Sequence, residues 1–293
     1  MRFTEIGQQL RAYRLESGLR AEEIAARLGV SRAALYRYEK GEVIKLDTIK
    51  RLAELLKISP LSLLGIGVEY YNRPVGYLER IRQVEETADQ ILQVNGALCY
   101  LTTTDSFDQA IALVYEEAAE QVGADRNSAR ASAEQVLGVL AARKRMYGMR
   151  RPGIIAMIPA ARMRALLEEG IAPALQVSER TRRMCREAAA TEVAHIAALM
   201  DAEPMGLQFG LVQAIELNGG FEILRARDRA TLAMNPFRAD ASPFGAPGVA
   251  MITAADEAIA AHQRVAETQW REATKGAAAA AEVHRMIEAA RGR

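Results

Sequence analysis

The sequence contains little of what disulfide bonding, secretion or membrane insertion requires. Only two of its 293 residues are cysteines, Cys99 and Cys185, and they lie far apart. Such sparse cysteine usage is typical of a reduced compartment. No stretch approaches about 18 consecutive apolar residues, and charges interrupt the first residues, so neither a membrane span nor a signal peptide is expected. We therefore expect a cytoplasmic protein with no membrane partner.

Residues and motifs that mark common active sites are scarce as well. The sequence has three histidines and no G-x-G-x-x-G, Walker loop, H-E-x-x-H or G-x-S-x-G motif. Its one E-x-x-H pair, Glu192 with His195, is too little for a di-iron site, which needs a second pair and further carboxylates. Arginines beside Cys185 favour a lowered thiol pKa, although an inert thiol is the simpler interpretation. We predict no enzyme, no catalytic residue, no metal and no cofactor.

Charge is nearly balanced over the chain but unevenly distributed. The formal net charge is +1, with 12 Lys+Arg and 8 Asp+Glu in residues 1–67 against 26 and 29 in residues 68–293. A basic N-terminal segment on an acidic remainder is expected of a protein that contacts nucleic-acid phosphates.

The most informative segment is RAEEIAARLGVSRAALYRYEKG, residues 20–41. Its apolar spacing predicts two short packed helices. Gly29 is expected to end the first in a left-handed conformation, and Ser31 to cap the second. The second helix then presents basic and polar side chains outward, an arrangement that suits a DNA major groove.

Amphipathic patterns on both sides complete a small domain. Residues 3–15 and 47–57 predict helices, the second with Asp47 as its cap, and a short apolar turn follows. The segments IGQQLRAYRLESGL, EEIAARLGVSRAALYRYEKGE and LDTIKRLAELLKIS together resemble the Cro/C1-type (Xre) helix-turn-helix domain of bacterial and phage regulators over residues 6–64. The resemblance implies a five-helix, lambda-repressor-like fold that binds double-stranded DNA.

The resemblance also implies residue roles. Arginine on the recognition helix suits guanine, because its fork donates to two acceptors at once, and lysines at helix ends suit phosphate. A carboxylate there is expected to be structural, so Arg14 and Glu39 are interpreted as a pair that joins two helices. The predicted DNA-contacting residues are Arg20, Ser31, Arg32, Ala33, Tyr36, Arg37, Lys40 and Lys45. Relatives often carry Gln where Arg20-Ala21 stands, so that contact is lost or is made by Arg20.

Other uses of such a domain stay open. A helix-turn-helix also serves in antitoxin-like proteins and in protein-interaction scaffolds, where its arginines are merely solvated. The charge distribution favours DNA binding over these alternatives.

A domain boundary is expected at residues 65–76, where Gly, Pro and Asn interrupt the periodicity. Residues 77–94 then space apolar side chains as a heptad stripe, which fits a dimerisation helix or a helix on its own domain. The dimer seam is slightly favoured because Xre-type domains usually bind palindromes as homodimers. We divide the chain into 1–67, a linker and dimerisation helix at 68–95, an α/β domain at 96–275, and an Ala-rich tail at 276–293 expected to form a frayed helix.

Residues 96–275 alternate strand-like and helix-like runs, which predicts a domain with one central sheet. Helices are expected near 106–122, 127–147, 160–169, 178–202 and 254–275. Strands are expected at Ala97–Thr103, Gly153–Ile158, Gly206–Val212, Phe221–Leu224, Ala230–Met234 and Gly248–Thr253.

This second domain is interpreted as a sensor of a small-molecule effector. Basic residues near a helix end and a Pro-rich loop make Arg150, Arg151 and Arg238 candidates for binding it. Solvated helix faces are the simpler interpretation of such charges. Residues 206–234 also loosely resemble the sensor halves of other regulators, some with a phospholipase-D-like core. The H-x-K signature of those hydrolases is absent, so such a core would be non-catalytic.

Overall fold

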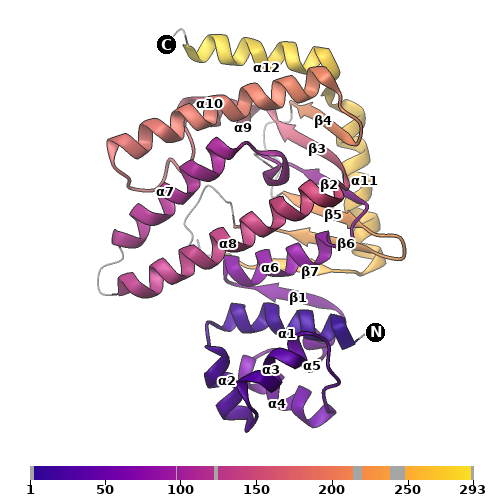
Figure 1. Cartoon of the computed structure of the whole chain (residues 1–293). Coiled ribbons are helices and arrows are strands. Elements are labelled where there is room, and N and C mark those ends of the chain that lie inside the picture. Colours follow the sequence, from indigo (N-terminus) through magenta and orange to yellow (C-terminus); the bar gives the residue numbers. More distant parts are fainter. Residues whose placement is uncertain (1–2, 97, 122–124, 214–219, 238–247, 292–293) are drawn as a thin grey trace.

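The computed structural model describes residues 3–96, 98–121, 125–213, 220–237 and 248–291. A small helical head at the N-terminus lies against a larger domain of helices around a mixed sheet, so the fold is α plus α/β, as predicted (Figure 1). The helices are α1 Phe3–Ser17, α2 Ala21–Leu28, α3 Arg32–Glu39, α4 Leu46–Leu56, α5 Pro60–Leu63, α6 Pro74–Glu85, α7 Asp105–Gln121, α8 Arg126–Arg150, α9 Ala160–Glu169, α10 Glu179–Ala202, α11 Asp256–Glu272 and α12 Gly276–Arg291. The strands are β1 Val68–Tyr71, β2 Gln90–Val94, β3 Gly153–Pro159, β4 Leu207–Val212, β5 Phe221–Arg225, β6 Ala230–Met234, β7 Ala250–Thr253 and β8 Thr274–Lys275.

The strands form one sheet in the order β1-β7-β6-β5-β2-β3-β4-β8. β2, β3 and β4 are parallel, and the other pairs are antiparallel. The parallel strands are joined by helical crossovers, α7 and α8 after β2, and α9 and α10 after β3. The lengths of the connections fit these strand directions, because parallel neighbours need a long crossover whereas antiparallel β5 and β6 need only a short turn.

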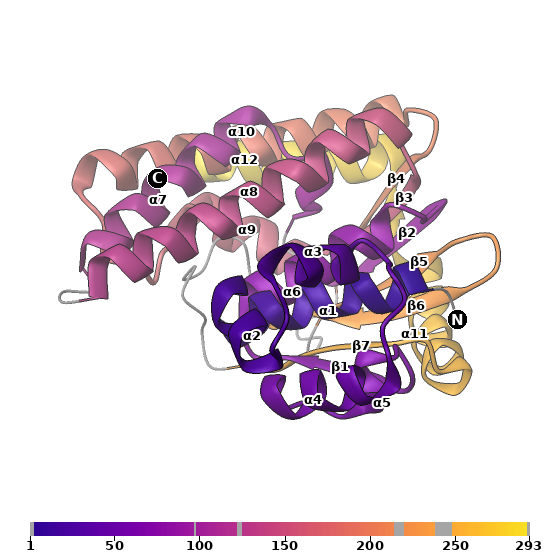
Figure 2. The same cartoon turned by 60° about the horizontal axis from the view of Figure 1, so that its bottom comes forward.

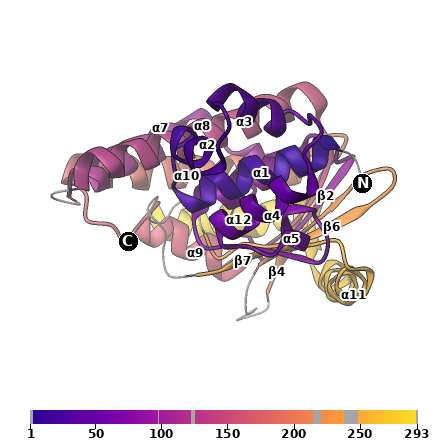
Figure 3. The same cartoon turned by 90° about the horizontal axis from the view of Figure 1, so that it is seen from below.

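Alternating side chains divide the core between the two faces of the sheet. Ile154, Ala156 and Ile158 of β3 belong to the large apolar cluster that includes side chains of α6, α8 and α10, whereas Met157 belongs to a smaller cluster with α11. Figure 3 shows the strands between α8 and α11. No helix of the described residues is long and apolar enough to cross a membrane.

The prediction of one helix over 77–94 is wrong at its C-terminal end. α6 stops at Glu85, and Gln90–Val94 form β2, paired with β3 and β5. A short apolar run fits a helix or a strand equally well, so only its tertiary neighbours decide. The predicted stripe residues Tyr77, Ile81 and Val84 are buried inside this chain. The alternative of a helix on its own domain therefore describes α6.

Three other local predictions also differ from the structure. The predicted strand at Ala97–Thr103 is wrong, because Tyr100–Thr102 form a 3-10 turn (η1) and the Thr102 and Thr103 hydroxyls donate to the carbonyls of Cys99 and Tyr100; Ala97 itself lies outside the described residues. Asp47 lies inside the first turn of α4, whose N-cap is Lys45. The tail forms α12, which is anchored by buried Ala279, Ala280, Val283, Met286 and Ile287.

The head joins the sheet domain through a shared aromatic core. Tyr13 of α1 stacks on Tyr71 of β1 with ring centroids 5.2 Å apart, and Tyr71 meets Tyr77 of α6 edge-on at 6.4 Å. All three rings are buried in an apolar cluster that runs from α1 into the second domain. The expected boundary at 65–76 thus contains β1, an edge strand of the sheet, and Figure 2 shows the head in front of β1 and α6.

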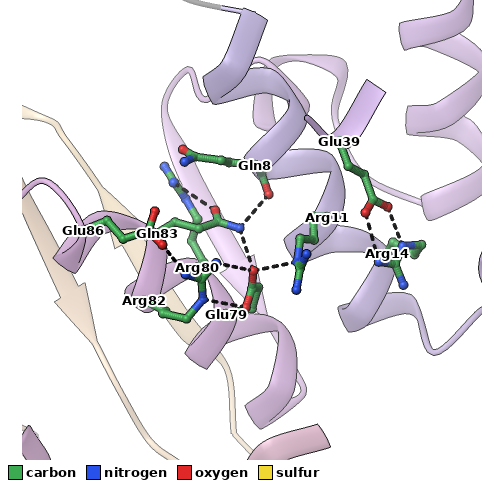
Figure 4. A network of polar contacts seen from close by, with 9 residues as sticks. All are labelled: Gln8, Arg11, Arg14, Glu39, Glu79, Arg80, Arg82, Gln83 and Glu86. Atoms are coloured by element: carbon green, nitrogen blue, oxygen red, sulfur yellow. Dashed lines mark hydrogen bonds and ion pairs between the residues drawn. The ribbon is translucent and has the colours of Figure 1, made fainter. Parts of the chain in front are cut away.

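Polar contacts fix the orientation of this junction (Figure 4). The Glu79 carboxylate on α6 is 1% exposed; it pairs with Arg11 of α1 at 2.8 Å and accepts hydrogen bonds from Arg82. Burial opposes ionisation of Glu79, but the Arg82 hydrogen bonds and the Arg11 charge hold its pKa below the usual value. Gln83 donates to the Gln8 carbonyl at 3.1 Å. A satisfied buried network of this kind favours one relative orientation of the two helices.

Candidate nucleic-acid interface

Local backbone chemistry places the recognition helix as the sequence predicts. Gly29 ends α2 with φ of 71°, a left-handed conformation that glycine adopts without steric cost. The Ser31 hydroxyl then accepts a hydrogen bond from the Ala34 amide at 3.1 Å and caps α3. Leu35, fully buried, holds the inner face of α3 against the head.

The outward face of α3 carries two well-exposed arginines. The side chains of Arg32 and Arg37 are 59% and 63% exposed. Each is paired at 2.7 Å with an exposed carboxylate of the same domain, Arg32 with Glu22 and Arg37 with Glu42. These acidic partners were not predicted from the sequence, because neither lies at a helical i+4 spacing. Exposed pairs contribute about 1 kcal/mol at most, so a guanine or a phosphate can replace the carboxylates.

Tyr36 organises the same face. Its ring centroid lies 5.3 Å from the Arg32 guanidinium carbon and 5.9 Å from that of Arg14, and its hydroxyl accepts a hydrogen bond from Arg32 at 3.3 Å. Cation–π contacts of this geometry hold a guanidinium in place at little entropic cost. Tyr36 thus orients Arg32 as well as offering its own hydroxyl.

The predicted pair between the first helix and the recognition helix is present. Arg14 donates from Nε and from its terminal nitrogen to the two Glu39 oxygens at 2.5 and 3.1 Å, and Glu39 is 8% exposed (Figure 4). This bidentate contact fixes the C-terminal end of α3 on α1. Glu39 therefore faces the protein interior.

The remaining predicted contacts surround this face. Ala33, Lys40 and Lys45 are exposed, the two lysines at the C-cap of α3 and the N-cap of α4. Arg20 is 80% exposed at the N-cap of α2, where it pairs with Glu23 of its own turn. All of these side chains are therefore accessible from solvent, and Lys40 directly continues α3.

A close backbone contact sets how α1 crosses α3. A Cβ atom on Gly7 would lie 2.4 Å from the Tyr38 carbonyl oxygen and 2.7 Å from that of Glu39. We expect Gly7→Ala to destabilise the head by about 1–3 kcal/mol, because rigid backbone must move. Gly138→Ala is the matched control: this helical glycine meets nothing within 4 Å, so alanine should stabilise by up to about 1 kcal/mol. Urea denaturation of both variants measures this, and equal effects would contradict the steric argument.

In the second domain, the residues considered for chemistry have structural partners. Glu192 accepts hydrogen bonds from the Thr104 amide and hydroxyl, and His195 contacts the Thr102 carbonyl at 3.1 Å. Burial raises the pKa of the Cys99 thiol to about 12 and also raises that of Cys185, so the suggested lowering at Cys185 is wrong. The described residues contain no group of three or more potential metal ligands.

Two of the candidate effector residues are absent from the wall of a cavity of about 320 Å³ that lies between α6, α8 and the sheet. Arg150 is 45% exposed, 3.9 Å from Asp89, and Arg151 is the C-cap of α8. Arg238 lies outside the described residues.

Comparison with known families agrees with the geometry of the head. Residues 5–63 match the family described as a helix-turn-helix domain, a span that runs from α1 to α5. The N-terminal segment is thus an Xre/Cro-type helix-turn-helix domain, which indicates a DNA-binding regulator. None of the curated proteins matches the chain.

Proposed function

We propose that the chain is a cytoplasmic transcriptional regulator that binds a palindromic operator as a homodimer, and that its second domain senses a small molecule without catalysing a reaction. The observation that carries this proposal is the face of α3 with exposed Arg32 and Arg37 and half-buried Tyr36, held by the largely buried Arg14–Glu39 pair. Base recognition needs donors on a rigid helix, and both conditions are met.

Dimerisation would place two recognition helices in successive major grooves, about 34 Å apart. The seam predicted at residues 77–94 is unsuitable, because the apolar side chains of α6 are buried within one chain. The second copy would have to use another surface. Leu61, Ile66 and Tyr70 are exposed apolar side chains near the junction of the two domains.

Fluorescence anisotropy with the DNA upstream of the gene tests the proposal. Arg37→Ala should weaken operator binding by about 1–3 kcal/mol, because a bidentate base contact is lost, and should relax sequence discrimination. Lys40→Ala should instead weaken binding to all sequences and reduce the salt slope by about one. Arg264→Ala, an equal charge loss at an exposed position of α11, should change neither. Sedimentation of the complex gives its stoichiometry.

Weak, sequence-independent DNA binding that is unchanged in the Arg37→Ala variant would contradict sequence-specific recognition of an operator. Stable copurification with a second protein would then favour the antitoxin-like or scaffold alternatives.

A further inference from the structure

A cavity of about 320 Å³ lies between α6, α8 and the sheet. Its wall includes Tyr77 of α6, Val136 and Arg143 of α8, and Glu222 of β5. Glu222 lies opposite Gln93 on one neighbouring strand and Ala233 on the other, and both of these residues also line the cavity. The volume is at the lower end of the range for small-molecule sites.

Several polar groups of this wall have no partner among the described residues. No hydrogen bond or ion pair contacts the Glu222 carboxylate within the part of the chain that the structure describes. The Tyr77 hydroxyl, on a side chain that is 1% exposed, is buried without a partner, and so is the Asn95 side-chain oxygen. Leaving such groups unpaired is costly, so a ligand or a bound water that completes them is favourable.

Arg143, the cation that acts electrostatically on Glu222, is already paired with another carboxylate. Arg143 donates to both Glu85 oxygens, at 2.9 and 2.6 Å, and the two side chains are 8% and 1% exposed. The pair is neutral as a whole, so the cavity retains unpaired acceptors and one unpaired carboxylate. Aromatic side chains, including Phe107, Phe221 and Phe237, line the rest and provide apolar and π surface.

We propose that this cavity binds a small aromatic or aliphatic ammonium ion, with its nitrogen on Glu222 and its apolar part among the aromatic side chains. A cationic donor satisfies the carboxylate and the neighbouring acceptors together. An anionic ligand would meet Glu222 with like charge and would find Arg143 occupied. Arg162, exposed at the rim, is the other cation of the wall, so an anion is a necessary comparison in the test.

One helix separates this cavity from the DNA-binding head. Pro74, Tyr77 and Leu78 of α6 face the cavity, whereas Glu79 and Gln83 of the same helix contact α1. The Tyr77 ring also contacts Tyr71, which in turn stacks on Tyr13, so these three rings connect the two domains. This part of the inference rests on the proposed function: occupancy of the cavity would shift α6, and with it α1 and α3.

Titration calorimetry of the full chain at pH 8, where Glu222 is ionised and the amine probe is still a cation, tests the ligand class with three probes. The probes share a phenyl group and an ethylene spacer: 2-phenylethylammonium, 2-phenylethanol and 3-phenylpropanoate. The cation should bind most tightly at one site. Glu222→Gln should weaken it about tenfold or more through loss of a charge-assisted contact. Glu134→Gln, the same change at an exposed position of α8, should leave it unchanged. Tighter binding of the anion, no binding of the cation, or indifference to Glu222 would overturn the proposal.

A second measurement tests the coupling. Saturating 2-phenylethylammonium should change operator affinity severalfold, and operator DNA should change the affinity for the cation by the same factor. Binding of the cation in the cavity without a change in operator affinity would overturn the coupling through α6, while the proposed class of ligand would still be supported. Failure of the chain to bind DNA would overturn the proposed function, while the calorimetric result on the cavity would be unaffected.

Discussion

Glu85→Ala should lower the free energy of unfolding by about 3–5 kcal/mol, the largest effect that we expect of any single substitution in this chain. Arg143 is buried and donates to Glu85 through two hydrogen bonds. Removing the carboxylate leaves the buried Arg143 guanidinium without a counter-charge, so the cost of desolvating this guanidinium is no longer offset. Urea denaturation measures the loss as a lower transition midpoint with an unchanged slope.

Two controls separate this effect from other causes. The double variant Glu85→Gln with Arg143→Met should recover most of the loss, because a neutral pair of similar volume carries no buried charge. Glu120→Ala removes the exposed partner of Arg126 and Arg130 and should cost less than about 1 kcal/mol. A small effect of Glu85→Ala would mean that Glu222 moves to pair with Arg143, which would weaken the case for a cationic ligand.

Replacing Glu222 with Gln should stabilise the protein more at pH 8 than at pH 5, and the difference between the two effects should be about 2.5 kcal/mol. Burial raises the pKa of Glu222 to about 7, from an ordinary value of 4.5. Arg143 opposes this rise, Glu85 adds to it, and Tyr77 and Cys99 also lie within electrostatic reach of the carboxylate. A difference of about 2.5 units between the folded and unfolded pKa corresponds to about 3 kcal/mol.

The sign follows from proton binding. Between pH 4.5 and 7 the folded state holds the Glu222 proton more tightly than the unfolded state does. The stability from this group is therefore complete below about pH 4.5 and is lost as the pH rises through about 7. Glutamine cannot titrate, so the advantage of the variant should grow over this window, as measured by denaturation at several pH values. For the exposed Glu134→Gln, the difference in unfolding free energy from the parent protein should not depend on pH. The same pH independence for Glu222→Gln would contradict a raised pKa of the buried Glu222.

The junction between the domains restricts how the head can move relative to the sheet domain. Gln9 of α1 donates to the buried Glu69 of β1 at 2.6 Å, and the Glu16 carboxylate accepts from the amides of Asn72 and Arg73. With these bonds in place, the head and α6 are expected to move as one unit. Under the proposed function, a change in the cavity would alter the position of the whole head and so the separation of two recognition helices in a homodimer.

Local chemistry explains where the sequence analysis succeeds. The helices of the head, the Gly29 turn and the Ser31 cap depend on residues within a few positions of one another, as do the β3 to β6 strands with their short apolar runs. The Arg14–Glu39 pair spans 25 positions and became predictable only because the family resemblance implied it.

The amino-acid sequence by itself determined the helix-turn-helix head and most helices and strands of the second domain, since periodicity and capping are properties of neighbouring residues. Only the tertiary structure decided that Gln90–Val94 form a strand and that α6 lies inside one chain. It also decided that Glu222 faces a cavity where the nearest arginine is already paired. Those outcomes depend on packing between segments as far apart as residues 85, 143 and 222, and no local pattern encodes such a juxtaposition.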